Sequence, residues 1–280
     1  AALTTAVIEG DYCRYSDGTI GRPRPGQVID RADPVGPSCR NALRGLRDHV
    51  APYYERVMRR TPNYEDLLYV IGQLADEWGG DLDNPLVEFG SGSVTRILSG
   101  GPNPGDKSYF ELQNYVRGVV CAELANVPRT SALAFVSEAI ASRPNTRIPI
   151  LTLNHDVAIE QHVSGIADGF TERERGLFSW DPASLAKVSD RPFLLKLHGS
   201  IDWRRHPGEV NRIIRFGPTS ENHYDLRRRV SQPVILAGTF NKLFGYTSGI
   251  FADLFELLRL ELRSLDALIV CGYGFGDKGI

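Results

Sequence analysis

The first half of the chain carries the apolar spacing that is typical of amphipathic helices. Residues 63–78 are the clearest case, because apolar side chains recur there at three- and four-residue intervals and define one face. Asn63 stands at the N-cap position, and Glu65 and Asp66 occupy the first turn, where carboxylates stabilise the amino end of a helix. The same spacing recurs in two further segments, at about 108–126 and 130–142. We therefore predict a helical subregion over approximately residues 38–143.

After Pro144 the pattern changes to short runs of almost continuous apolar residues. Four runs have the length of strands: 148–153, 193–197, 234–237 and 267–271. A very apolar segment of helical length, at 250–265, separates the last two runs, and we expect it in the core, with a subunit interface as the alternative. Strands that are apolar on both faces and alternate with helices are typical of a parallel sheet covered on both sides. We therefore predict an α/β fold built on a parallel sheet.

Composition and charge narrow the class of protein. The chain has 32 Lys and Arg against 34 Asp and Glu, a net charge of −2, which excludes a polybasic nucleic-acid binder and an acidic solvating chain. A hydrophobic fraction of 42% over 280 residues is enough for a substantial core, and no apolar run reaches the ~18 residues of a membrane helix. The four cysteines are scattered without a C-x-x-C pair, and Cys121 and Cys271 stand in apolar stretches. This usage favours buried free thiols in a reducing, cytoplasmic compartment.

The organisation of the chain is expected to be simple. The sequence begins at Ala1 without Met and stops at Ile280, immediately after a glycine-rich turn. We expect residues 1–280 to form a single domain that is a fragment of a longer chain, with the helical subregion inserted in its N-terminal half.

Residues suited to chemistry or to tight turns follow all four predicted strands. These segments are Asn154-His155-Asp156, His198-Gly199-Ser200, Gly238-Thr239 and 272–277, which reads G-Y-G-F-G-D. Because the carboxyl ends of parallel strands meet at one edge of the sheet, we expect these segments to converge there. Each has a simpler interpretation by itself: Asp156 could cap a helix at 157–163, a lone His is more often a structural hydrogen-bonding residue, and the glycines could only close turns. Their conjunction indicates a ligand site.

Three strings resemble the sirtuin-like domains of bacterial anti-phage defence proteins. The most specific is K-L-H-G-S-I-D-W at 196–203, and the others are T-L-N-H-D at 152–156 and G-Y-G-F-G-D at 272–277. The segment Y-E-D-L-L at 64–68 also resembles this family, so the resemblance covers about 60–280. It implies a Rossmann-like parallel sheet flanked by helices and NAD as the substrate.

The resemblance also implies roles for individual residues. His198 matches the catalytic histidine, which works near the ribose hydroxyls of NAD. Asn154 and Asp156 match the amide and the carboxylate that line the nicotinamide pocket and position a water or the carboxamide, and Asn154 is the second catalytic candidate. The remaining cofactor-binding residues implied are Thr152, Gly199, Gly238, Thr239, Gly272, Tyr273, Gly274, Phe275 and Asp277.

Two departures from the family pattern bear on the activity. The G-A-G-x-S turn that cradles the pyrophosphate in sirtuins is absent, and 204–233 lacks the two C-x-x-C pairs of the protein-deacylating sirtuins. We therefore expect no zinc, and no other metal, and we favour NAD cleavage over deacylation. Breaking the nicotinamide–ribose bond creates an oxocarbenium-like centre, which requires electrostatic support and a controlled nucleophile. An imidazole with a pKa near ~6.5 can exchange a proton with a ribose hydroxyl at neutral pH.

Arginines gather in the region where the zinc module would otherwise lie: Arg204, Arg205, Arg212, Arg215, Arg227, Arg228 and Arg229. A solvated basic face is one interpretation. A contact for cofactor phosphates, a partner subunit or nucleic acid is the other.

These expectations define a function and its alternatives. The leading hypothesis is an NAD+ hydrolase that yields ADP-ribose and nicotinamide and depletes NAD in anti-phage defence. An NAD-dependent protein deacylase and a non-catalytic NAD- or ADP-ribose-binding assembly module are the alternatives. The resemblance implies a homo-oligomer, a partner defence protein or a further domain of the same chain, with no membrane partner and nucleic acid involved only indirectly.

Overall fold

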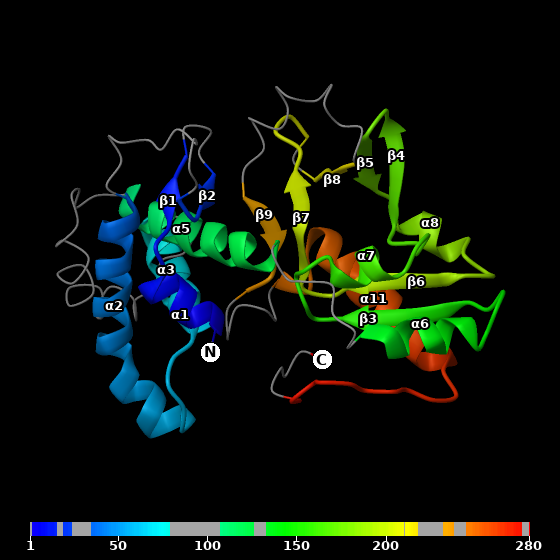
Figure 1. Ribbon diagram of the computed structural model, residues 1–280, viewed down its shortest axis with the longest axis horizontal. Helices are drawn as coiled ribbons and strands as arrows, with labels where there is room; N and C mark the ends of the chain where they lie inside the picture. The colour runs from blue at the N-terminus through cyan, green and yellow to red at the C-terminus, as the bar shows by residue number, and fades with distance from the viewer. Residues whose placement is uncertain are drawn as a thin grey trace. The chain divides into compact units, whose positions relative to one another are not determined.

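Figure 1 shows the computed structural model of the protein. It describes residues 2–15, 19–23, 35–78, 107–125, 133–209, 211–217, 232–237, 245–275 and 280. The chain divides into two compact units, which we call the helical unit and the sheet unit. The helical unit is Ala1–Glu123 with Ala237–Asn241, and the sheet unit is Leu124–Leu236 with Lys242–Ile280. That they form a single sirtuin-like domain stays a prediction.

The helical unit contains two of the three helices that the apolar spacing predicts in the first half of the chain, whereas the third, predicted at 130–142, lies in the sheet unit. The helices of the helical unit are α1 (Ala2–Glu9), α2 (Val35–Tyr53), α3 (Tyr64–Trp78) and α5 (Lys107–Leu124), and a π-helical turn, η1 (Tyr54–Met58), continues α2. A short antiparallel pair, β1 (Cys13–Arg14) and β2 (Ile20–Gly21), lies beside them. Leu43, Leu67, Ile71, Val116 and Val119 are fully buried, which is the apolar face expected of amphipathic helices. Among the described helices of the whole chain, none is both long and apolar enough to cross a membrane.

The start of α3 confirms the predicted N-cap. Asn63 Oδ1 accepts hydrogen bonds from the backbone N–H groups of Glu65 (2.8 Å) and Asp66 (3.1 Å). Asp66 Oδ2 accepts the Asn63 N–H in return, at 2.7 Å, so the two side chains form a reciprocal capping box. Asp66 is fully buried, and its charge is matched by Arg60, whose Nη2 donates to Asp66 Oδ1 at 2.8 Å.

In its described residues, the sheet unit holds one parallel strand pair and one antiparallel sheet. β3 (Ile148–Thr152) and β6 (Pro192–Lys196) pair in parallel, with Ile148 opposite Pro192 and Thr152 opposite Lys196. The antiparallel sheet has the order β4-β5-β8-β7-β9 and consists of β4 (Phe170–Glu174), β5 (Leu177–Trp180), β8 (Ile213–Phe216), β7 (Gly199–Arg205) and β9 (Pro233–Ile235). The helices of this unit are α6 (Ala134–Ala141), α7 (Ala158–His162), α8 (Pro182–Ala186) and α11 (Gly249–Ser264). The protein is thus a mixed α/β structure with a small parallel sheet.

Two of the four predicted parallel strands differ in the structure. The runs 148–153 and 193–197 form the parallel pair, as predicted. The run 234–237 contributes to β9, but β9 pairs antiparallel with β7, so its predicted direction is wrong. An apolar run indicates that a strand is buried on both faces, but it does not specify whether the strand pairs in parallel or antiparallel. The run 267–271 forms no strand, and its residues, including Cys271, are exposed, which contradicts the expected buried thiol.

The core of the sheet unit lies between the parallel pair and α11 (Figure 1). Phe193 and Leu195 of β6 pack in one buried cluster with Leu254, Phe255 and Leu258 of α11, so the predicted core position of this helix is confirmed. A partly buried ion pair fixes the same helix to the beginning of β3. Arg147 donates to both carboxylate oxygens of Glu261, one of them at 2.7 Å, and its guanidinium lies 4.2 Å from the centre of the Phe193 ring.

Gly199, at the start of β7, is required by both backbone conformation and space. Its φ is +81°, and a Cβ built on it would lie 2.2 Å from the Val234 carbonyl oxygen of the neighbouring strand. Gly165 has a similar φ of +73° but has no atom within 4 Å of such a Cβ. Gly165 therefore isolates the effect of backbone conformation from that of the steric clash.

We predict that Gly165→Ala lowers the free energy of unfolding by about 1 kcal/mol, through the left-handed backbone alone. Gly199→Ala should lower it by about 2 kcal/mol more, because β7 and β9 must move apart. Urea unfolding of the two variants beside the wild type measures both values. Equal losses in the two variants would show that β9 does not approach Gly199 as described.

Candidate functional site

Two of the predicted site segments meet at the carboxyl ends of β3 and β6. We call this place the β3–β6 edge and define it as residues 152–156 and 196–201. The Leu197 N–H donates to the Thr152 carbonyl at 3.0 Å, and the Ile201 N–H donates to the His155 carbonyl at 2.9 Å. The segment that follows β3 is therefore hydrogen-bonded to the segment that follows β6, which confirms this part of the expected convergence.

His198 is a buried side chain at the centre of the edge. It is 4% exposed, and its Nε2 lies 3.1 Å from the Tyr246 hydroxyl. The two rings are almost parallel, at 13° with centroids 6.1 Å apart, and Tyr246 in turn stacks on Phe255 of α11 at 3.9 Å. His155, also buried, places its ring centroid 6.2 Å from that of His198. Tyr246 thus fixes the plane of the imidazole, and no sequence pattern pointed to this tyrosine.

The polar residues after β3 have different surroundings. The Asn154 side chain is exposed, and its backbone N–H donates to Thr152 Oγ1 at 3.1 Å. Asp156 Oδ1 accepts the Ala158 N–H at 2.9 Å and so caps the first turn of α7. This is the capping role that the sequence left open for Asp156. Thr152 and Asp156 therefore shape the backbone of the segment, while Asn154 presents its amide to solvent.

A buried lysine beneath the edge was not assigned a role by sequence reasoning. Lys196, the last residue of β6, is 2% exposed. Its Nζ donates to the Asp156 carbonyl and, at 2.8 Å, to Glu160 Oε1 on α7. A lysine inside an apolar strand was the available signal, because a buried ammonium requires a partner. The partner itself is set by the tertiary structure.

Burial shapes the titration of two carboxyl groups near this edge. Burial raises the pKa of Glu160 above its usual value, and the ammonium of Lys196 offsets only part of the effect. Burial likewise raises the pKa of Asp168, against the opposing effect of its ion pair with Arg215. Asp202 of β7 adds negative charge near both groups and raises both pKa values further. Each of these two carboxyl groups is thus paired with a cation, Lys196 for Glu160 and Arg215 for Asp168.

Among the other predicted cofactor-binding residues that the structure describes, only Gly199 is part of the β3–β6 edge as defined above. The contact that requires a glycine there is with the Val234 backbone. Gly272, Tyr273, Gly274 and Phe275 lie in a segment that follows no strand, so their expected position at a strand end is wrong. In that segment the rings of Tyr273 and Phe275 are 4.8 Å apart. Gly238, Thr239 and Asp277 lie outside the described residues.

Three of the clustered arginines take part in the antiparallel sheet. Arg204 donates to the Ile201 and Trp203 carbonyls at 2.6 and 2.8 Å. Arg212 Nε donates to Ser179 Oγ at 2.9 Å, and Arg215 pairs with Asp168. These contacts place the guanidinium groups within the packing of β5, β7 and β8. Arg227, Arg228 and Arg229 lie outside the described residues.

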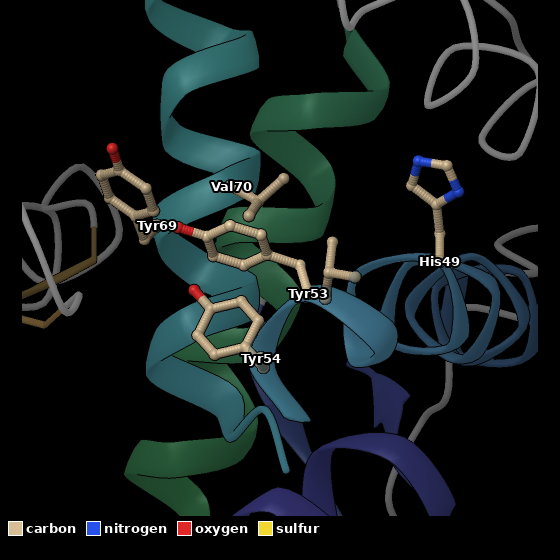
Figure 2. A pocket seen from close by; sticks show the side chains of 6 residues that line it. His49, Tyr53, Tyr54, Tyr69 and Val70 are labelled. Carbon is tan, nitrogen blue, oxygen red and sulfur yellow. The ribbon is translucent and has the colours of Figure 1, made fainter. Parts of the chain in front are cut away.

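The helical unit has a separate aromatic recess of about 420 Å³ where α2 passes into η1. It is lined by His49, Val50, Tyr53, Tyr54, Tyr69 and Val70. Figure 2 shows the rings of Tyr53 and Tyr54 close together, with Tyr69 beside them and His49 standing apart. The Tyr53 and Tyr54 rings meet edge to face, with centroids 5.8 Å apart. Burial raises the pKa of Tyr54 and of Tyr69, so both phenols stay neutral.

Comparison with known proteins adds no assignment. No protein-family model matches the sequence, and no curated protein matches it. In the described part of the chain, no group of three or more His, Cys, Asp and Glu side chains is arranged to hold a metal ion.

We predict a distinct pH dependence for the stability contribution of Glu160. Because its pKa is raised from 4.5 in the folded protein, the folded state keeps a proton at pH values where the unfolded chain has lost it. This contribution is complete below the unfolded pKa and is lost as the pH rises through the folded pKa. The free energy of unfolding of the wild type should therefore fall relative to that of Glu160→Gln as the pH rises above 4.5.

Urea unfolding of both proteins from about pH 4 to about pH 8 measures this difference, in which the other titrating groups cancel. A difference that is flat, or that rises with pH, would contradict the buried position of the carboxyl group.

Proposed function

We propose that this protein is a sirtuin-like NAD+ hydrolase that cleaves NAD+ to ADP-ribose and nicotinamide, with a Rossmann-like fold. The observation that carries the proposal is the hydrogen-bonded meeting of the Asn154–Asp156 segment with the buried His198 at the carboxyl edge of parallel strands. Ligands of α/β sheets bind at such edges. The three strings that resemble the sirtuin-like family supply the choice of NAD.

The chemistry assigns each group a task. As the nicotinamide–ribose bond breaks, positive charge develops on the ribose, and the enzyme must stabilise that charge. Asn154 orients the attacking water or the leaving carboxamide without adding charge. His198 exchanges a proton with a ribose hydroxyl, either after that hydroxyl displaces Tyr246 from Nε2 or through the Tyr246 hydroxyl itself.

Anti-phage defence by depletion of NAD, with activation by an oligomer, a partner protein or a further domain, completes the proposal. Deacylation is the less favoured activity, because a peptide groove in sirtuins is built with the zinc module. Residues 204–233 have no cysteine for such a module, and β8, within this range, pairs with β7 and β5.

A second candidate function is a non-catalytic module that binds NAD or ADP-ribose. The specific observation in its favour is that His198 is 4% exposed and already hydrogen-bonded to Tyr246. Binding of ADP-ribose, measured by calorimetry, without nicotinamide release in the presence of any activating partner would select this candidate over the hydrolase.

We predict that His198→Ala and Asn154→Ala each lower the rate of NAD hydrolysis at least ~10²-fold, the loss expected when an acid–base or orienting group is removed. The control is His162→Ala, since His162 lies at the end of α7, in the same unit, and is only partly buried. Nicotinamide release by the full chain measures all three variants. Near-normal turnover in either site variant, or an equal loss in the control, would rule out the assignment.

A further inference from the structure

The Lys196 side chain links β6 to the segment that joins β3 to α7. It stands opposite Thr152 in the parallel register and is almost fully buried. Its ammonium contacts two successive parts of the segment, the Asp156 carbonyl and the Glu160 carboxylate. The link therefore spans the end of the loop and the first turns of α7.

This link follows two backbone contacts in an ordered series. The Leu197 N–H holds the Thr152 carbonyl, and the Ile201 N–H holds the His155 carbonyl. Lys196 adds the Asp156 carbonyl, so the segment is attached to β6 and β7 from the end of β3 to the start of α7. Asn154 lies within the attached stretch, and His198 follows Lys196 by two residues. The position of Asn154 relative to His198 thus depends on this series.

Stability alone does not explain a lysine at this position. Removing an ammonium and a carboxylate from water costs more than their attraction commonly returns, and apolar pairs of similar volume often fold as well or better. An apolar pair, however, has no donor that could hold a carbonyl and a carboxylate in fixed directions. We propose that Lys196, together with Glu160, is a positioning residue that holds the Asn154–Asp156 segment in place against His198. Its effect on turnover depends on the proposed NAD hydrolysis, whereas its effect on the segment does not.

The test compares three variants of the full chain. Lys196→Met leaves the Glu160 carboxylate buried without its ammonium, and Lys196→Met/Glu160→Leu replaces the pair with apolar side chains. The matched control is Arg147→Met/Glu261→Leu, which removes the partly buried ion pair at the opposite end of β3. Each variant is measured by urea unfolding, by kcat and KM for nicotinamide release, and by amide hydrogen exchange of residues 154–158.

We expect Lys196→Met to be destabilised. The double variant, Lys196→Met/Glu160→Leu, should regain the unfolding midpoint of the wild type. The kcat of the double variant should nevertheless stay at least ~10-fold low with KM little changed, because misplaced catalytic groups slow the chemical step. Its amides at 154–158 should exchange at least ~10-fold faster than in the wild type. The control pair should keep the kcat and the exchange rates of the wild type at 154–158.

Recovery of kcat together with stability in the double variant overturns the proposal, since the pair is then only structural. So does unchanged exchange at 154–158, or a double variant that fails to fold while the control folds. If the wild type releases no nicotinamide even with its activating partner, the proposed hydrolase fails. The exchange of residues 154–158 in the folded double variant then decides the positioning role by itself.

Discussion

The parallel pairing of β3 with β6 is the constraint on which the candidate site depends. Five consecutive residue pairs, from Ile148 and Pro192 to Thr152 and Lys196, fix the register. Since both strands end at the same place, the residues that follow them are brought together although about forty positions separate them in the sequence. A shift of this register by one residue would turn Lys196 away from the Asp156 carbonyl, because every side chain of the shifted strand would move to the other face of the pair.

Each end of this strand pair carries an ion pair, and the two pairs have different consequences. At the beginning, Arg147 and Glu261 join β3 to α11 and complete the packing of the core around Phe193. At the end, Lys196 and Glu160 lie beneath the segment that bears Asn154. The first pair connects β3 to α11, in a region where apolar side chains of α11 already pack in the core. The second connects a loop whose central residues, 154–156, are all polar, and there directional hydrogen bonds matter more.

The change from parallel to antiparallel pairing happens within a few residues of His198. The Leu236 N–H donates to the His198 carbonyl at 2.8 Å, so β9 reaches the histidine, and Gly199 permits the close approach of Val234. The imidazole is enclosed between this junction and Tyr246, which is supported by Phe255. A rigid and buried imidazole results, suited to a single orientation toward a ligand.

Sequence reasoning reached the elements whose signals are local. The spacing of apolar residues and the capping residue Asn63 gave α3, and unbroken apolar runs gave β3 and β6, together with the meeting of 154–156 and 198–200. Sequence reasoning failed where strand direction or a side-chain contact depends on residues far away in the chain. The antiparallel direction of β9 is set by hydrogen bonds to β7, and the partners Tyr246 and Glu160 are chosen by the fold. The alternation of β7, with Ile201 and Trp203 buried beside the more exposed Asp202 and Arg204, was a usable strand signal that went unread.

The most direct test of the account is whether a fragment of the proposed substrate binds at the β3–β6 edge. ADP-ribose titrated into the full chain, with the imidazole resonances of His198 and the side-chain amide of Asn154 followed by NMR, addresses this without requiring turnover. If ADP-ribose binds at this edge, the resonances of both groups shift and reach saturation, while those of His49 in the helical unit stay unchanged. Binding that shifts neither His198 nor Asn154 would contradict the account.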